Sequence, residues 1–215
     1  MTAWSVEALC VGKAVPFKGE EKSAFAKAPI SGPVTIQREG LVGDEQADRK
    51  HHGGPDMAVH LYPADHHAFW NEQLGGHALL DTPGAFGTNL SVRGIDEAQI
   101  LIGDQFRLGS ALIEVSQPRK PCWKIEHRFA RKGMVADIIR TGRSGWYFRV
   151  LEEGHTQAGD QLEQVASGHD GWSVARVFSA LFSAKTSVSE LEGVAALTKL
   201  SQDHRDRAFQ RAQNL

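Results

Sequence analysis

One cysteine lies among cationic side chains in the segment Ser116–Lys124, which reads SQPRKPCWK. Arg119, Lys120 and Lys124 favour the thiolate form of Cys122, because nearby positive charge stabilises the anion. A thiolate attacks electrophiles or binds a soft metal. Two prolines stiffen the approach and indicate a loop instead of a helix or a central strand. The segment predicts a reactive or metal-binding thiol, and the alternative interpretation is a small buried core residue.

A second dense group of polar residues spans positions 43–60. A glycine pair within it lets the backbone approach a ligand closely and presents amide N–H groups to an anion. Two adjacent histidines precede the pair, and a third follows it on the polar face of a predicted strand. With a lysine-containing loop upstream, these features predict a phosphate site. The residues concerned are Lys22, Ser23, Lys27, His51, His52, Gly53, Gly54 and His60.

The charge is small overall but unevenly distributed. The formal net charge is −2, so no global field favours nucleic acid or an anionic membrane as a partner. Between Arg119 and Arg143, eight lysines and arginines face two acidic residues, a local excess of +6. This run is either a solvated face or, because it begins beside Cys122, the rim of an anion site.

Composition also limits the class of protein. The 215 residues contain 41% hydrophobic and 23% charged side chains, as expected of a soluble globular chain. No apolar stretch approaches the ~20 residues of a spanning helix, and the N-terminal residues lack a signal-peptide pattern. Two cysteines cannot form a disulfide framework, and Cys10 is interpreted as a packing residue in a strand. We expect a reduced, cytoplasmic protein with neither nucleic-acid nor membrane partners.

Histidines are numerous enough to raise zinc as an alternative, at His51, His52, His60, His66 and His67. The sequence has no HExxH motif and no paired CxxC, which are the usual zinc spacings. The pair at 66–67 falls in a predicted surface helix, where we expect it to be solvated.

Short alternating runs dominate up to about residue 165 and predict a mainly β fold of the barrel or sandwich type. Strands are expected at 4–11, 34–41, 57–62, 99–102, 105–108, 111–116, 145–151 and 161–166. Gly103-Asp104 predicts a hairpin turn between two of them. No βαβ alternation is visible. Helices are expected at 64–74, 123–132 and 134–141.

The pattern changes after about residue 167. Helical spacing from Val174 to Leu181, a capping box at Ser187–Glu190 and a polar tail predict three short helices. We therefore divide the chain into a β domain, residues 1–167, and a helical extension, residues 168–215. The extension is expected to dock on the β domain or on a second subunit, which makes a homodimer one option.

Several blocks of this sequence, in order, resemble the MOSC domain family, and most closely its bacterial YiiM-like branch. They are KSAFAK at 22–27, GLVGDEQAD at 40–48, HHGGPD at 51–56, AVH at 58–60, FGTNL at 86–90, IGD at 102–104, QPRKPCWK at 117–124 and GRSGWYFRVL at 142–151. The family commonly has glutamate where this chain has Thr88, and this departure either weakens that part of the site or is a tolerated surface change.

The resemblance implies an α+β, mainly β fold: a MOSC-type β-barrel with short helices, here with a C-terminal three-helix extension. It also implies a molybdopterin form of the molybdenum cofactor, with Cys122 as protein ligand to molybdenum. By the same resemblance, Lys22, Lys27 and Arg119 hold the cofactor phosphate with Ser23, His52, Gly53 and Gly54 nearby, Asn89 donates to the cofactor, and His51 and His60 are proton donors or phosphate contacts.

The function implied is molybdenum-dependent reduction of N-hydroxylated compounds, such as hydroxylaminopurine-type bases, amidoximes and hydroxylamines, as a detoxification. A separate reductase would supply electrons, because the sequence has no flavin, haem or iron–sulfur motif. One alternative is a carrier that holds the cofactor or sulfur on Cys122 without turnover. Another is a thiol- or metal-dependent hydrolase, for which no base or zinc triad is evident.

Overall fold

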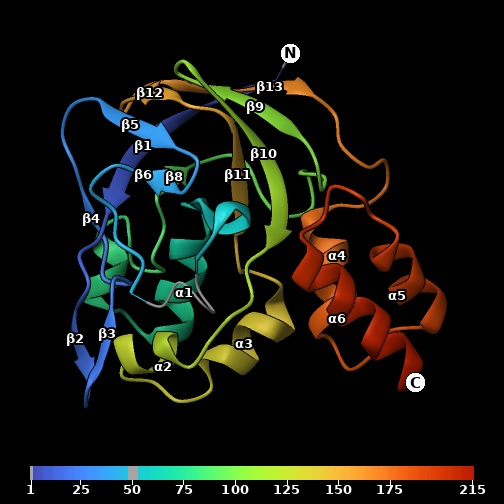
Figure 1. Cartoon of the computed structure of the whole chain (residues 1–215). Coiled ribbons are helices and arrows are strands. Elements are labelled where there is room, and N and C mark those ends of the chain that lie inside the picture. The colour runs from blue at the N-terminus through green and yellow to red at the C-terminus, as the bar shows by residue number, and fades with distance from the viewer. Residues whose placement is uncertain (1, 48–52) are drawn as a thin grey trace.

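The computed structural model describes residues 2–47 and 53–215, and its centre is a closed β-barrel (Figure 1). The strands are β1 (Ala3–Val11), β2 (Val15–Lys18), β3 (Glu21–Ser23), β4 (Ala28–Pro29), β5 (Val34–Gln37), β6 (Gly40–Leu41), β7 (Val59–Pro63), β8 (Leu90–Val92), β9 (Gln105–Leu108), β10 (Ala111–Pro118), β11 (Trp146–Glu152), β12 (Gly154–Thr156) and β13 (Gln161–Ala166). The barrel order is β13-β9-β10-β11-β7-β8-β1, closed by pairing of β1 with β13, and β4 pairs with β1.

The helices of the described chain are short. They are α1 (His66–Leu74), α2 (Lys124–Arg128), α3 (Met134–Thr141), α4 (Val174–Phe182), α5 (Val188–Ala195) and α6 (Gln202–Gln213), with single 3₁₀ turns η1 (Pro55–Met57) and η2 (Ala78–Asp81). The expected helix at 123–132 is wrong in its second half. Helix α2 ends at Arg128, and Ala130 takes a left-handed φ of 48°, which an α-helix cannot accommodate.

Strand pairing is antiparallel throughout the barrel except between β7 and β8, which run parallel. Helix α1 and turn η2 form the crossover between these two strands, as a parallel pair requires. The strand at 57–62 and the helix at 64–74 were expected from the sequence, but their place in a parallel βαβ unit was not. The fold is nevertheless α+β and mainly β, as predicted.

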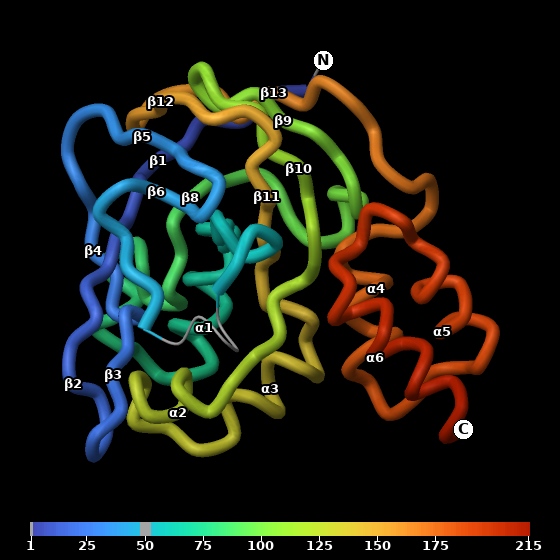
Figure 2. The backbone as a smooth tube through the Cα atoms, viewed as in Figure 1, coloured from blue at the N-terminus to red at the C-terminus, as the bar shows by residue number. Residues whose placement is uncertain are grey.

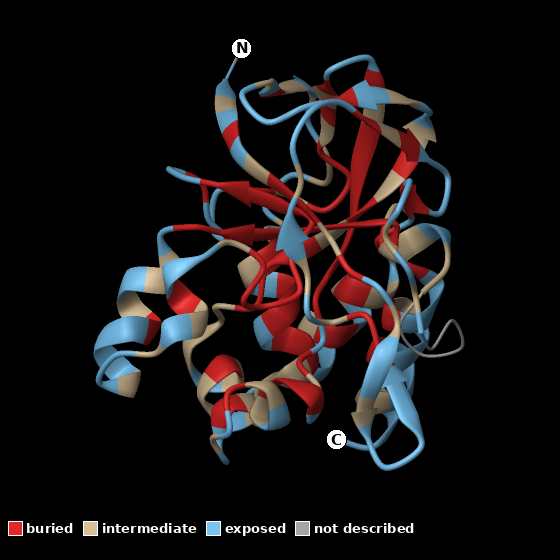
Figure 3. Ribbon diagram, turned by 90° about the vertical axis from the view of Figure 1, so that its left-hand side faces the viewer, coloured by how far each residue is buried: buried red, intermediate tan, exposed pale blue. Residues whose placement is uncertain are grey.

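The barrel interior is filled by apolar side chains from alternate positions of its strands, and Figure 3 shows these strands buried along much of their length. Phe106 of β9 and Phe148 of β11 meet edge to face, with ring centroids 5.7 Å apart. A second apolar cluster, around Tyr62, Trp70 and Phe86, lies between β7 and the short helices. The barrel is therefore a packed core, and a ligand site must lie outside it.

The strand expected at 99–102 is wrong. Leu101 makes only an isolated bridge with Ser173, because the backbone here bonds to the segment that leads into α4. Ile102 N donates to Trp172 O at 3.0 Å, and Val174 N donates to Ile100 O at 2.8 Å. The predicted hairpin at Gly103-Asp104 is absent for the same reason, and β9 pairs instead with β10 across residues 109–110.

The strand expected at 57–62 begins two residues later, because Pro55–Met57 forms η1. All five residues of β7 are buried, so its alternation does not separate a core face from a solvent face. The side of the strand that carries His60 and Tyr62 is covered by the second apolar cluster and by the site described below.

The extension, α4 to α6, packs beside β10 (Figure 2). Apart from Phe178, which packs in the second cluster, its buried apolar residues belong to the same core as those of the barrel, including Val177, Leu181, Leu191 and Ala208. Ser201 N donates to Ser116 O at 3.0 Å, so the start of α6 is attached to β10 just before the cysteine loop. The extension therefore docks on the β domain of its own chain.

Candidate functional site

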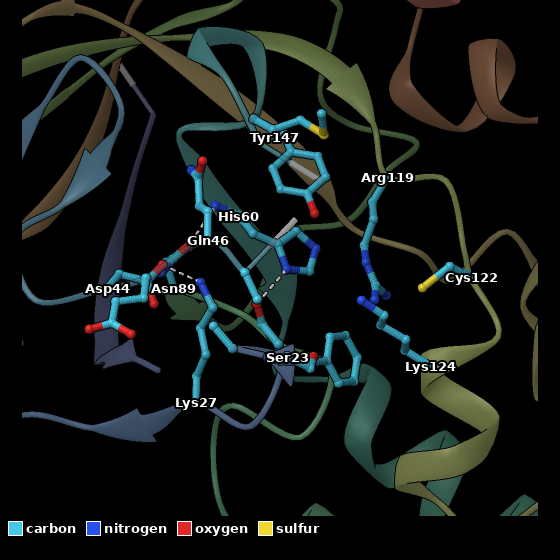
Figure 4. A pocket seen from close by; sticks show the side chains of 16 residues that line it. Ser23, Lys27, Asp44, Gln46, His60, Asn89, Arg119, Cys122, Lys124 and Tyr147 are labelled. Atoms are coloured by element: carbon cyan, nitrogen blue, oxygen red, sulfur yellow. Dashed lines mark hydrogen bonds and ion pairs between the residues drawn. The ribbon is translucent and has the colours of Figure 1, made fainter. Parts of the chain in front are cut away.

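A cavity of about 90 Å³ opens where the barrel meets the cysteine loop, and we call it the inner compartment (Figure 4). Side chains that are distant in sequence enter it from opposite sides: Lys27, Asp44 and Asn89 on one side, Arg119 and Cys122 on the other. Its lining residues are Ser23, Ala24, Phe25, Lys27, Asp44, Glu45, Gln46, Ala47, Met57, His60, Gly87, Asn89, Arg119, Cys122, Lys124 and Tyr147.

Asn89 joins three parts of the chain behind this cavity. Its Oδ1 accepts from His60 N at 3.0 Å, and its Nδ2 donates to Cys10 O at 3.1 Å and to Asp44 Oδ2 at 2.9 Å. Asp44 also forms an ion pair with Lys27 and accepts from Gly12 N at 2.7 Å. Both donors of the Asn89 amide are thus engaged within the protein, so this residue positions others and has no free N–H for a ligand.

Lys27 is a cation held in a largely buried place, with 12% of its side chain exposed. Burial lowers its pKa, and the Asp44 carboxylate opposes that shift. The ion pair fixes the ammonium at the cavity wall, but Asp44 lines the same cavity, so the pair as a whole adds no net charge to it.

His60 lies on β7 and is only 1% exposed. Its Nδ1 is 3.1 Å from Gly87 O, and because a carbonyl only accepts, Nδ1 carries the hydrogen. Burial, and then the positive charge of Arg119, hold the pKa of His60 well below its usual range. The imidazole is therefore neutral at neutral pH, and Nε2 presents a lone pair.

Arg119 is 4% exposed and lies over the ring of Phe25, with 5.2 Å from Cζ to the ring centroid. The turn at 144–145 holds its backbone: Arg119 N donates to Gly145 O at 3.0 Å, and Ser144 Oγ donates to Arg119 O. This turn is itself held by Glu97, which accepts from both of its amides. The guanidinium is therefore positioned by a chain of buried hydrogen bonds.

Two buried polar atoms of the inner compartment, Arg119 Nη1 and His60 Nε2, have no hydrogen-bond partner among residues 2–47 and 53–215. Leaving such an atom unsatisfied costs about 1–3 kcal/mol, and more for a charged group. A free guanidinium N–H, a free imidazole lone pair and a lysine around one cavity suit an anionic ligand with hydrogen-bonding groups.

Cys122 lies at the border between the inner compartment and a larger cavity of about 880 Å³, which we call the outer compartment. Lys124 and Tyr147 also border both cavities, and burial raises the pKa of Tyr147. Sites for drug-sized ligands occupy roughly 300–1,000 Å³. A ligand of that size must therefore extend from the inner into the outer compartment, past the thiol.

The outer compartment is shared by the barrel, the cysteine loop and the extension. Trp123, which is 41% exposed, contributes an indole to its rim. The remaining lining residues are Glu21, Lys22, Ala47, Gly53, Gly54, Pro55, Asp56, Met57, Gln117, Lys120, Ser201, Gln202, Asp203 and His204.

The sequence-predicted site residues fall into three groups. Ser23, Lys27, His60, Asn89, Arg119 and Cys122 all line the inner compartment. Lys22, Gly53 and Gly54 line only the outer one. His51 and His52 lie outside the described residues, so their roles stay predictions.

Thr88 does not line either compartment. It is buried, its Oγ1 accepts from Tyr62 N at 3.0 Å, and its single hydroxyl hydrogen is shared between Leu90 O at 2.8 Å and His60 O at 3.2 Å. This hydroxyl is therefore part of the junction between β7 and β8, and it is not a surface position.

The expectation of a solvated histidine pair in α1 is wrong. His66 Nε2 lies 2.8 Å from Glu97 Oε2, and His67 Nδ1 lies 3.0 Å from Leu80 O. Neither histidine supports a zinc site, since the described part of the chain contains no group of three or more His, Cys, Asp or Glu side chains able to hold a metal.

Sequence reasoning assigned no role to Asp44, Glu97, Tyr147 or the first turn of α6. Asp44 and Tyr147 fall within the family blocks at 40–48 and 142–151, which could have indicated them. Glu97 and the α6 turn have no local signal, because their importance depends on backbone groups about 50 or more residues away.

Comparison with known proteins identifies the class. Residues 48–163 match the MOSC domain. The chain is 44% identical to the uncharacterized protein YflK of Bacillus subtilis over 80% of its length and 77% of that protein, and 40% identical to the protein YiiM of Escherichia coli over 74% and 71%.

A protein named reductase from Gibberella moniliformis is 39% identical over 74% of this chain, which corresponds to 28% of that longer protein. The crystal structure of YiiM from Geobacillus stearothermophilus superposes with a TM-score of 0.83 and 29% identity, covering 97% of this chain and 99% of that one. The chain belongs to the MOSC domain family, and its whole architecture, extension included, is that of the YiiM proteins.

Among the described residues, every helix is too short or too polar to cross a bilayer.

Proposed function

We propose that this protein is a molybdenum-cofactor-dependent reductase of N-hydroxylated compounds. The observation that carries the proposal is the pair of unsatisfied buried atoms, Arg119 Nη1 and His60 Nε2, beside a partly exposed thiol at Cys122. Membership of the MOSC family and the reductase name of one relative support the same reading.

The residues present fit such a cofactor. Arg119 and Lys27 would bind its anionic groups through charge-assisted hydrogen bonds, and His60 Nε2 would accept a hydrogen bond from it. The Cys122 thiolate suits a soft, thiophilic metal. Burial raises the pKa of Tyr147, so it keeps its phenolic proton, and its hydroxyl, which borders both compartments, would donate to a bound cofactor. When bound, the cofactor supplies the two-electron chemistry.

The reaction balances with a separate electron donor. Reduction of an N–OH group breaks the N–O bond, consumes two electrons and two protons, and releases the N–H product and water. A partner reductase supplies the electrons. The protons come from solvent through the outer compartment, because the neutral His60 has no proton to give at Nε2.

The test measures molybdenum and released pterin per chain, in protein produced in a host that makes the cofactor, followed by turnover of an amidoxime with a chemical or enzymatic reductant. We expect near-stoichiometric molybdenum and N-reduction in the wild type, and loss of both in Cys122→Ser. Bound cofactor without turnover would refute the reductase and favour a carrier that holds the cofactor on Cys122.

A further inference from the structure

The first turn of α6 closes the outer compartment on the side of the extension. Ser201, Gln202, Asp203 and His204 all line this cavity, and none of them lines the inner one. A ligand group that contacts them therefore lies away from the Lys27 and Arg119 side of the site.

This wall is held in place by the barrel. Besides the bond from Ser201 N to Ser116 O, Arg149 Nη1 donates to Lys199 O at 2.8 Å, two residues before the turn. Arg149 also bonds to Asp56 Oδ1 and Glu114 Oε1, at 2.7 and 2.8 Å. The turn is thus fixed relative to β10, β11 and η1, as a binding surface should be.

Two features give the turn a capacity to bind. His204 is 2% exposed, and its Nε2 has no hydrogen-bond partner within the described chain. Ser201 Oγ lies 3.2 Å from His204 Nδ1 and does not cap α6, so the amide groups of the first turn keep their capacity to donate.

Charge then selects between ligands. Asp203, whose side chain is 89% exposed, brings a carboxylate to the wall and repels an anionic group there, which opposes the attraction of Lys120 on the cysteine loop, whose charge also acts on His204. An uncharged acceptor, such as a carbonyl or a ring nitrogen, meets the N–H groups without that repulsion.

We propose, on the basis of the function proposed above, that the first turn of α6 binds the end of the substrate remote from its N–OH group and selects an uncharged hydrogen-bond acceptor there. The extension is then a specificity element of the reaction carried out by the barrel.

The test compares three probes: N-methylhydroxylamine, which is too small to span the compartments, and benzamidoximes with a para-carboxamide or a para-carboxylate. The wild type should have a higher kcat/KM for the carboxamide than for the carboxylate. Asp203→Lys should shift that ratio toward the carboxylate by roughly three- to tenfold, as expected for reversing one exposed charge, and leave N-methylhydroxylamine unchanged.

Glu192→Lys is the control, since it makes the same charge change at an exposed position of α5 and lines neither compartment. A ratio that Asp203→Lys moves no further than Glu192→Lys does would overturn the inference and leave the reductase intact. If the loaded wild type reduces none of the probes, the proposed function fails, and calorimetric titration of the two benzamidoximes into the same variants decides the inference by binding alone.

Discussion

Glu97 is a buried carboxylate that organises the site without touching it. It is 5% exposed, and its Oε1 accepts from Ser144 N at 3.0 Å and Gly145 N at 2.7 Å. Its Oε2 lies 2.8 Å from His66 Nε2. Because Ser144 and Gly145 hold the backbone of Arg119, we predict that substitution of Glu97 lowers both stability and cofactor retention.

The magnitude follows from the bonds lost. Glu97→Ala leaves two buried N–H groups unsatisfied at about 1–3 kcal/mol each, so the free energy of unfolding should fall by about 2–6 kcal/mol. Glu97→Gln keeps an acceptor for these amides but replaces charge-assisted bonds by neutral ones, a loss of about 1 kcal/mol per bond. We expect a loss of about 2 kcal/mol for this variant.

The assay is urea unfolding of the cofactor-free protein, with pterin content of the loaded protein as the second readout. Glu192→Ala, at an exposed position of α5, is the control and should change stability by no more than about 0.5 kcal/mol. A Glu97→Ala variant as stable as Glu192→Ala, with pterin content equal to that of the wild type, would refute the positioning role.

Three other predictions concern single groups. Burial lowers the pKa of His204 to about 4, so between pH 6.5 and 4 the unfolded chain binds more protons than the folded one, and stability falls as the pH falls. Between pH 7 and pH 5, urea unfolding should show that the wild type loses about 2 kcal/mol more free energy of unfolding than His204→Gln does. Equal losses in the two proteins would contradict this. Gly145→Ala places a Cβ 2.3 Å from a β7 carbonyl oxygen, whereas Gly142→Ala at a similar φ meets nothing within 4 Å. Thermal unfolding should therefore show Gly145→Ala to be much less stable than Gly142→Ala. Equal melting temperatures would contradict this and mean that the turn at 144–145 shifts to accommodate the methyl group. Arg119→Ala should lower pterin content per chain at equal protein, and Lys120→Ala, on the exposed neighbour, should change it much less; the reverse order would move the anion site to the outer compartment.

Local sequence signals predicted those elements that depend on local interactions. Helix 134–141 and strand 161–166 have the bounds expected from periodicity and flanking glycines. The strand expected at 99–102 failed because its backbone partners lie about 70 residues later, in the lead to α4. Periodicity and residue types within a window of about ten residues cannot indicate a hydrogen-bond partner so distant in sequence.

The site shows the same division. The thiol and its cationic loop were evident from residue types alone. The resemblance to the family also assigned Lys27, His60 and Asn89 to the site, and all three line the inner compartment with Cys122. The direction of each side chain was not predictable. Asn89 was expected to donate to the cofactor, but both N–H groups of its amide donate to Cys10 O and Asp44 Oδ2 instead. The reason is its position, where β1 and β7 meet the loop that carries Asp44.

The three helices of the extension were predicted correctly, but the contact of α6 with the outer compartment depends on how the extension packs against the barrel. Its apolar stripes predict packing, whereas the position of the α6 turn at the cavity follows from one backbone bond to β10 and the contacts of Arg149. These partners are 50 to 85 residues distant in sequence, so the sequence could not indicate that α6 borders the site.

Cysteine ligation of molybdenum is tested by measuring molybdenum and pterin per chain in wild type and Cys122→Ser, purified side by side from a cofactor-producing host. We expect about one molybdenum and one pterin per wild-type chain, with molybdenum lost from the variant while its fold is retained. A wild-type chain without either, or a variant that keeps its molybdenum, would contradict it.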